Sequence, residues 1–347
     1  MAEIALRAQP ETGRAATRVP TGGVVIVLAV LTVLLCLVSL AVGSQSLTLE
    51  ELVSAFVPGE RTVASIIVWQ LRMPRTVLAA MVGAALAVAG VVMQGLTRNP
   101  LAEPSILGVN AGASLSVVLS MSLLGLTDVG EFLWFAFAGA ALAAFLVHLI
   151  SVRSADAGPA RLVLAGVALG ASLRSITGTV TMYDSVTFDS YRFWVLGSLV
   201  DRDAELLVWV APFLVVGLVL ALASGLTLNA LALGEEQAKA LGVSPRRARA
   251  LALTSITLLC GASTAAVGPI SFVGLVVPHV LRLALGADQR KLLAVSVVAG
   301  PVLLLAADIL GRVILDSGEM EAGVVTAFIG GPVLLLMVIQ RMGVRGR

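Results

Sequence analysis

The chain has 347 residues, of which 58% are hydrophobic and 13% charged, and its formal net charge is +2. A soluble domain carries roughly 25% charged residues, so a chain this apolar cannot fold as a soluble globule and must have the lipid bilayer as its solvent. The basic residues are scattered between apolar runs and form no stripe that a phosphate backbone could follow, which excludes a nucleic-acid-binding surface.

Long apolar stretches recur along the chain and predict membrane-spanning helices. A helix needs about 20 mostly apolar residues to cross a bilayer. The clearest stretches are 24–42, 76–97, 105–124, 132–150, 162–182, 204–224, 250–268, 292–311 and 322–340. A shorter stretch at 270–286 contains Pro278, His279 and Arg282 and is counted as one more span. We therefore predict an all-α integral membrane protein of about ten transmembrane helices.

The two ends of the chain are predicted to be short tails. Arg7, Arg14 and Arg18 precede the first span as the basic region of a signal peptide would, but the apolar core is long for that role. We therefore expect the first span to be an uncleaved membrane anchor. We expect a tail at 1–22, a single permease domain at 23–342 and a second tail at 343–347.

The distribution of Lys and Arg predicts the orientation. With the N-terminus in the cytoplasm, most of the 23 Lys and Arg residues fall in cytoplasmic segments, as the positive-inside rule requires. An even number of spans then returns the C-terminus to the same side. We expect a multi-pass protein of a bacterial cytoplasmic membrane with both termini inside.

The sequence also limits the energy source of a transporter. Proton- or sodium-coupled carriers usually keep ionisable groups at mid-membrane, and the predicted spans are almost free of Asp, Glu and Lys. Sodium binding by the carbonyls of broken helices stays open. A P-loop needs Gly-Lys-Ser/Thr, and neither Lys239 nor Lys291 lies in one. An ATPase that powered this chain would be another polypeptide.

Catalytic and metal-binding patterns are absent from the sequence. The spans contain no nucleophile–base pair and no carboxylate dyad, which disfavours a membrane-embedded enzyme. Cys36 and Cys260 lie singly in apolar runs, and His148 and His279 are far apart, which argues against a metal site. We expect no catalytic residue, no metal and no cofactor bound by this chain.

One long polar segment, 229–249, lies on the predicted cytoplasmic side and reads NALALGEEQAKALGVSPRRAR. Gly234 and Gly242 divide it into short helical pieces. Four residues predict one apolar face: Leu233, Ala238, Leu241 and Val243. The segment is either a solvated amphipathic loop or a surface that binds a partner supplying energy.

Four motifs resemble the FecCD/BtuC-type permease family, the transmembrane subunits of type II ABC importers for iron-siderophores, haem and cobalamin. They occur in the family's order and, together, the resemblance covers roughly 60–342. They are LRMPRTVLAAMVGAALAVAGVVMQGLTRNPLAEPSILGVNAGA at 71–113, LALGEEQAKALGV at 231–243, GPISFVGLVVPHVLRL at 268–283 and AGVVTAFIGGPVLLLM at 322–337. The resemblance implies a dimer of permease subunits, identical or paralogous, two ATP-binding subunits and an extracytoplasmic substrate-binding protein. ATP and Mg would be bound by the ATPase, and membrane lipid would surround the permease.

The resemblance also implies where the chain contacts its ATPase and closes its pathway. The coupling contact would comprise Gly234, Glu235, Ala238, Leu241 and Gly242. The cytoplasmic gate would comprise Asn99, Pro100 and Leu101, with a second part at Pro159 and Ala160. Family members can carry small hydroxyl residues at the second part, which this chain lacks. An ordinary turn before proline is the alternative for Asn99.

Arginines near the outer ends of the spans match the family's docking positions for the binding protein. They are Arg72, Arg75 and Arg312, and guanidinium groups suit bidentate pairing with carboxylates. Interfacial anchoring by snorkelling is the alternative. The outer turn departs from the family pattern, since Glu321 stands where proline is common.

Arg174 lies within the fifth span, where a cation is costly unless it faces water, an acid or the transport pathway. We expect a pathway residue, a member of a structural ion pair or a side chain that snorkels to the outer interface. The substrate is expected to be a ferric siderophore, with cobalamin or haem as alternatives within the family and an ion-coupled secondary transporter as the alternative class.

Overall fold

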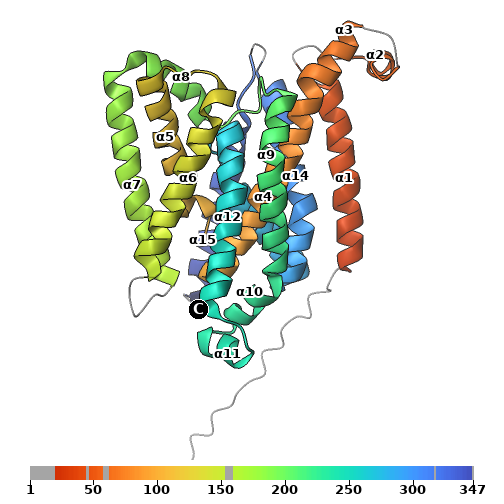
Figure 1. Cartoon of the computed structure of the whole chain (residues 1–347). Helices are drawn as coiled ribbons and strands as arrows, with labels where there is room; N and C mark the ends of the chain where they lie inside the picture. The colour runs from red at the N-terminus through yellow and green to blue at the C-terminus, as the bar shows by residue number, and fades with distance from the viewer. Residues whose placement is uncertain (1–19, 44–46, 58–61, 153–158, 316–317, 346–347) are drawn as a thin grey trace, which may run out of the picture.

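The computed structural model describes residues 20–43, 47–57, 62–152, 159–315 and 318–345 (Figure 1). Most of the predicted N-terminal tail, 1–19, and the last two residues lie outside the described residues. The described helices are α1 (Thr21–Ala41), α2 (Leu49–Ser54), α3 (Val63–Ile66), η1 (Ile67–Arg72), α4 (Met73–Thr97), η2 (Pro104–Leu107), α5 (Val109–Leu124), α6 (Val129–Val152), α7 (Pro159–Tyr183), α8 (Ser185–Val195), α9 (Ala204–Ala223), α10 (Gly225–Ala232), α11 (Glu235–Ala240), α12 (Pro245–Val267), α13 (Val273–Leu285), α14 (Gln289–Val313) and α15 (Ala322–Arg345).

The all-α membrane architecture predicted from the sequence is confirmed. Among the described residues, 8 helices are long and apolar enough to cross a membrane. Two shorter apolar helices, α5 and α13, lie within the same bundle. Together they account for about ten spans.

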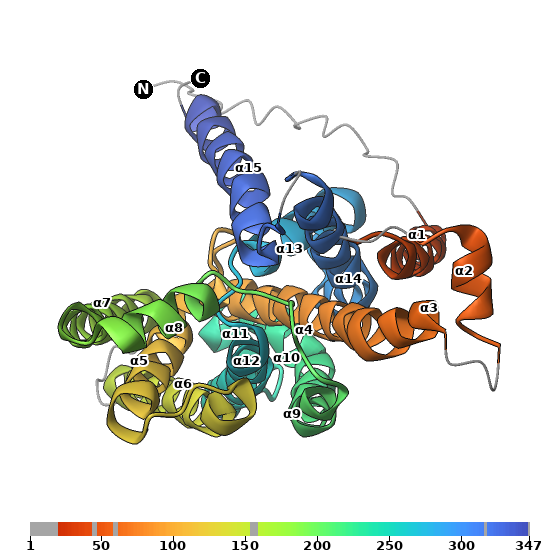
Figure 2. The same ribbon diagram turned by 90° about the horizontal axis from the view of Figure 1, so that it is seen from above.

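Helix α4 forms the centre of the bundle (Figure 2). Its continuous helical segment, Val63–Thr97, has 83% of its most apolar stretch buried inside the chain, more than any other long span. Helices α14, α13, α12 and α9 surround it, and α1 packs outside α14. At Gly90 the backbone of α4 meets α13 so closely that an added Cβ would lie 1.9 Å from the carbonyl oxygen of Gly274. Small residues therefore permit the central packing, as expected in lipid.

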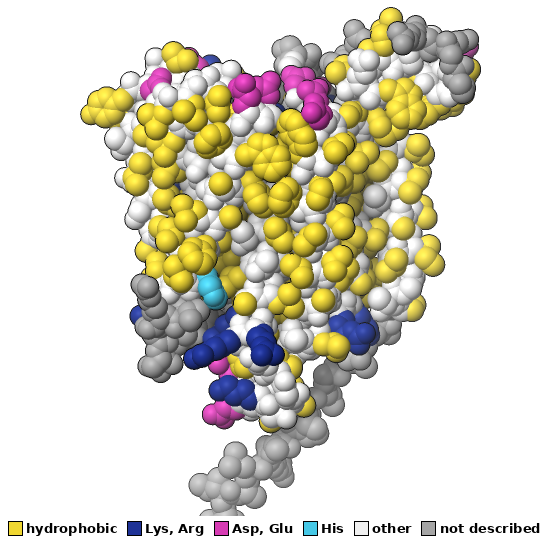
Figure 3. Space-filling view, viewed as in Figure 1, with side chains coloured by type: hydrophobic (Ala, Val, Ile, Leu, Met, Phe, Trp, Pro, Cys, Tyr) yellow, Lys and Arg dark blue, Asp and Glu magenta, His cyan; other side chains and the backbone are white. Residues whose placement is uncertain are grey.

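The bundle has two distinct ends. The start of α1, helices α10 and α11, and the last turn of α15 lie at one end, which we call the α11 end (Figure 1). Helices α2, α3 and α8 lie at the other, which we call the α8 end. On the face in Figure 3, Lys and Arg gather at the α11 end, Asp and Glu gather at the α8 end, and apolar side chains form the band between them. The positive-inside rule associates such a basic end with the cytoplasm, and the orientation itself stays a prediction.

Two differences from the predicted boundaries change how a segment is assigned. The second span begins at Val63 and not at 76, because α3 and the π-helical turn η1 continue directly into α4. Polar residues in that turn, Gln70 and Arg72, interrupt the apolar pattern without interrupting the helix. Helix α15 continues to Arg345, so residues 343–345 of the predicted C-terminal tail are helical.

Candidate functional site

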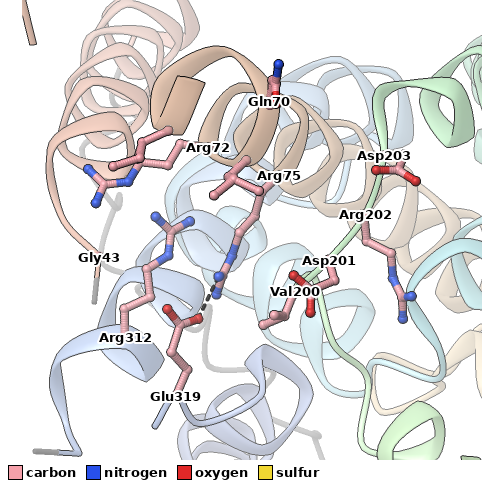
Figure 4. Close-up of a pocket in the computed structure, with 12 residues that line it drawn as sticks. Gly43, Gln70, Arg72, Arg75, Val200, Asp201, Arg202, Asp203, Arg312 and Glu319 are labelled. Atoms are coloured by element: carbon pink, nitrogen blue, oxygen red, sulfur yellow. Dashed lines mark hydrogen bonds and ion pairs between the residues drawn. The ribbon is translucent and has the colours of Figure 1, made fainter. Parts of the chain in front are cut away.

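A buried ionic cluster lies at the α8 end, between α4 and α14 (Figure 4). Asp308 of α14, with a side chain that is 1% exposed, accepts hydrogen bonds from Nη2 of Arg75 at 2.7 Å and from Nε at 3.0 Å. Nη1 of the same guanidinium donates to Oε2 of Glu319 at 2.6 Å. Glu319 lies on the turn before α15 and is 21% exposed. Arg75 is therefore held by one buried carboxylate and one accessible carboxylate.

Two further arginines fasten the end of α1 to this cluster. Nη1 of Arg72 donates to the carbonyl oxygens of Leu40 at 2.7 Å and Ala41 at 2.8 Å. Nη1 of Arg312 donates to the carbonyl of Ser39 at 2.7 Å, and its Nη2 pairs with Asp308. The last carbonyls of a helix have no partner within the helix and carry partial negative charge, so guanidinium groups satisfy them well.

The three predicted docking arginines are thus brought together, and each is also bonded inside the chain. They line one cavity of about 580 Å³ at the α8 end, together with Glu319 and the loop containing Arg202. Within the described residues of the cluster, three guanidinium groups face the carboxylates of Asp308 and Glu319. The cavity wall also carries Asp201, Asp203 and Arg202, so its arginines lie among a matching number of carboxylates.

Arg202 separates this cavity from a second one of about 470 Å³ that contains Phe193, Trp194 and Glu321. Its guanidinium points away from Arg75 in Figure 4, and its Nε has no hydrogen-bond partner among the described residues. Burial lowers the pKa of Arg202 to about 10, so it remains a cation at neutral pH. The α8 end therefore presents cationic groups to two adjoining cavities.

The predicted coupling segment forms a separate projection at the α11 end. Leu233 and Leu241 are each 64% exposed, whereas Ala238 is fully buried against Leu231 and Ala248, with Val243 packed beside them. The four apolar residues do not form the single face that we predicted. Two point outwards and two point into the chain, because two short helices cannot keep one helical register. Ala238 supports the projection from within and offers no exposed side chain.

The two glycines of this segment have backbone angles that favour glycine. Gly234 has φ +118° and Gly242 has φ +79°, in the region that side chains with a Cβ rarely adopt. They turn the chain into and out of α11. Glu235 directly follows the first turn, and its carboxylate pairs with Arg249 of α12. This ion pair connects α11 to a transmembrane helix.

A second connection links the projection to α14. Nδ2 of Asn229 donates to Oδ1 of Asp288 at 2.9 Å, and its Oδ1 accepts from the backbone N–H of Gln289 at 2.9 Å. Asp288 is the N-cap of α14. The hydrogen bond from Asn229 lowers the pKa of the Asp288 carboxyl, which keeps it ionised at neutral pH. Displacement of α10 and α11 would therefore act directly on the start of α14.

The predicted gate residues lie at the α11 ends of α4 and α7. The chain leaves α4 through Arg98, which has φ +50°, and Oδ1 of Asn99 then accepts from the N–H of Leu101 at 3.1 Å. The loop is anchored by Glu103, whose Oε1 accepts from the N–H of Phe272 at 2.7 Å, just before α13. Pro100 lies inside this turn. Pro159 and Ala160 begin α7, and Ala160 is exposed.

Arg174 stands apart from these clusters, on an exposed face of α7. Ser175 and Gly178 are also exposed, and the spacing of the three residues places them on one side of the helix. Helix α7 is the least apolar of the long spans, yet only 17% of its most apolar stretch is buried in the chain. Helix α1, which is similarly exposed at 11% buried, is the most apolar. The surface of α7 is therefore poorly suited to contact lipid alone.

Sequence reasoning missed several residues that organise these sites. Asp308 was visible as a rare acid in an apolar span, which is a signal of function, but its partner Arg75 comes from another helix, α4. Glu319, Asp288 and Glu103 lie in loops and Asn229 in the short helix α10, where nothing in the local pattern distinguishes them from solvated residues.

Comparison with known proteins gives relatives along almost the whole chain. The FecCD transport family model matches residues 31–340. The ferric enterobactin transport system permease protein FepD of Escherichia coli is 43% identical, with 90% of this chain and 94% of the relative covered. The vitamin B12 import system permease protein BtuC of Vibrio cholerae is 42% identical, with 79% and 83% covered. The hemin transport system permease protein HmuU of Yersinia pestis is 36% identical, with 90% and 94% covered.

The fold has a solved counterpart. A structure described as an inward-facing conformation of a metal-chelate type ABC transporter superposes with a TM-score of 0.81 and 28% sequence identity. The match covers 92% of this chain and 99% of that one. The helix arrangement therefore agrees with the relatives that the sequence identifies.

Proposed function

Because the chain belongs to the FecCD transport family, we propose that it is the membrane-spanning subunit of an ABC importer that moves a ferric siderophore into the cytoplasm. It is a multi-pass membrane protein, and its relatives are permease components of import systems. The ATP would be hydrolysed by a separate subunit. The α11 end would face the cytoplasm and the α8 end would face outwards.

The coupling proposal is carried by the projection of α10 and α11. Leu241 and Leu233 are exposed apolar side chains at the end where an ATPase would dock, and their burial in an interface would remove apolar surface from water. The Glu235–Arg249 pair and the Asn229–Asp288 hydrogen bond would transmit the movement to α12 and α14. Gly234 and Gly242 would allow close approach of the partner.

The gate proposal follows from position. Asn99, Pro100 and Leu101 form a turn at the α11 end that is tied to α13 through Glu103. Pro159 and Ala160 begin the helix that carries Arg174. A movement of α13 would therefore shift the turn at Asn99, and a movement of α7 would shift Pro159 and Ala160. Both parts would close the pathway.

The docking proposal concerns the arginine-lined cavity at the α8 end. Carboxylates of a substrate-binding protein would enter this cavity and approach Arg75, Arg72 and Arg312. Since Arg75 already donates to Glu319 at 2.6 Å, an incoming carboxylate would have to share or replace that partner. Such an exchange would keep docking reversible, as a transport cycle needs.

The substrate proposal rests on Arg174. A cation at this depth is tolerated where it faces protein, water or an anionic substrate. The exposed face of α7 that carries Arg174, Ser175 and Gly178 would pack near a second permease subunit and border a pathway between the two. Ferric siderophore complexes are often anionic, and Arg174 would attract them. Since the FepD, BtuC and HmuU relatives have similar identities, cobalamin and haem remain the alternative substrates.

Uptake by proteoliposomes containing the permease, its ATPase and its binding protein tests this proposal. We expect uptake of an anionic ferric siderophore, and a smaller rate for Arg174→Gln than for wild type. The uptake rate of an uncharged ferric complex should fall less in this variant. Transport of cobalamin or haem without siderophore uptake would contradict the substrate assignment, and equal losses for both ferric complexes would remove Arg174 from the pathway.

A further inference from the structure

A groove lies between α6 and α12 in the half of the bundle nearer the α11 end. Its volume is about 280 Å³, and it opens on the apolar face shown in Figure 3. Its wall includes Phe137, Phe145 and His148 of α6, and Ala250, Thr254 and Leu258 of α12. The groove belongs neither to the ionic cluster nor to the coupling projection.

Helical spacing shows which residues of α12 adjoin the groove on its side towards the α11 end. Since α6 and α12 run in opposite directions, His148 and Ala250 both mark its side towards the α11 end. Arg246 and Arg247 precede Ala250 by four and three residues, so they extend the same face of α12 by one turn. Both are exposed. An apolar groove thus continues into two arginines and a histidine.

These cations differ from the other arginine of the same helix start. Arg249 is paired with Glu235, whereas no ion pair joins Arg246 or Arg247 to a described residue. They lie in the first turn of α12, at the end of the bundle where Lys and Arg gather beyond the apolar band in Figure 3. An apolar cleft topped by cations at that depth complements an acyl chain attached to a negatively charged headgroup.

We propose that this groove binds an anionic phospholipid. One acyl chain lies between α6 and α12, and the phosphate is held by Arg246, Arg247 and His148. The assignment of this lipid to the cytoplasmic leaflet rests on the proposed function, but the existence of the site does not. Each arginine near an anionic lipid contributes on the order of fivefold in affinity, so a preference of at least about tenfold over a zwitterionic lipid is expected.

Native mass spectrometry of the full permease in detergent tests the site. The probes are phosphatidylglycerol and phosphatidylcholine with the same acyl chains. We expect selective retention of phosphatidylglycerol by wild type and at least about tenfold weaker retention by the Arg246→Gln/Arg247→Gln double variant. Lys291→Gln removes an exposed cation at the same end but on α14, and should behave as wild type.

A second variant separates the groove from simple charge attraction. Ala141 lines the groove, and Ala141→Leu should reduce retention of both lipids by occupying the space of the acyl chain. Equal retention of phosphatidylglycerol by wild type and the double arginine variant would overturn the proposal. So would loss of ATPase binding in that variant with lipid retention unchanged, because the arginines would then serve the partner protein.

Discussion

Replacing Asp308 by Asn removes the charge that holds the α8 end of the bundle together while preserving the shape of the side chain. The carboxylate lies between Arg75 of α4 and Arg312 of its own helix, and Arg312 in turn binds the last carbonyls of α1. The substitution therefore tests whether one buried anion organises three helices. We expect a folded protein with much lower stability.

The magnitude follows from burial. The side chain of Asp308 is 1% exposed and accepts from Nε and Nη2 of Arg75 and from Nη2 of Arg312. Removing one member of a buried ion pair costs about 3–5 kcal/mol, because the remaining charge is left without its partner. Asn retains one oxygen acceptor, so we expect about 3 kcal/mol, which corresponds to roughly a 150-fold change in the unfolding equilibrium.

The assay is reversible unfolding of the purified permease by a denaturing detergent, followed by circular dichroism. Asp203→Asn is the matched control, since Asp203 is an exposed aspartate on the wall of the same cavity. It should change the free energy of unfolding by less than about 0.5 kcal/mol. The double variant Asp308→Asn/Arg312→Met should lose less than the sum of the two single variants, because they share one interaction. Equal stability of Asp308→Asn and wild type would refute this account of the cluster.

Three further outcomes test the proposed couplings. Leu241→Ala should weaken ATPase binding at least about tenfold, whereas Leu283→Ala, which alters an exposed leucine of α13, should not; co-purification at several ATPase concentrations measures both. Asn229→Ala should leave ATPase binding intact but lower the substrate transported per ATP hydrolysed in proteoliposomes, since the link to Asp288 is lost. Unchanged stoichiometry would place the coupling elsewhere. Glu319→Gln should tighten docking of the binding protein about threefold to tenfold by removing a competitor for Arg75, and weaker docking would mean that Glu319 is structural.

The sequence predicted the membrane architecture because the bilayer imposes a strong and local pattern. An apolar run of sufficient length has few alternatives to a spanning helix, so α1, α6, α9 and α14 could be placed from composition alone. The start of the second span was missed because hydropathy averages over Gln70, Arg72 and Arg75, whereas the backbone continues through them as a helix.

The candidate sites were only partly predictable for a different reason. The family resemblance located Arg72, Arg75 and Arg312, but their partners depend on how α1, α4 and α14 pack, which no local pattern encodes. The same limit applies to the coupling segment. Periodicity predicted that Leu241 and Ala238 lie on the same apolar face. The turns at Gly234 and Gly242 instead leave Leu241 exposed and Ala238 buried.

The most direct test of the central claim is ATP-driven uptake by proteoliposomes that contain this permease with its ATPase and binding protein, in the absence of any ion gradient. We predict accumulation of ferric siderophore only when ATP is present on the side of the α11 projection. Uptake that proceeds without the ATPase and is driven by a proton or sodium gradient would contradict the account and identify an ion-coupled carrier.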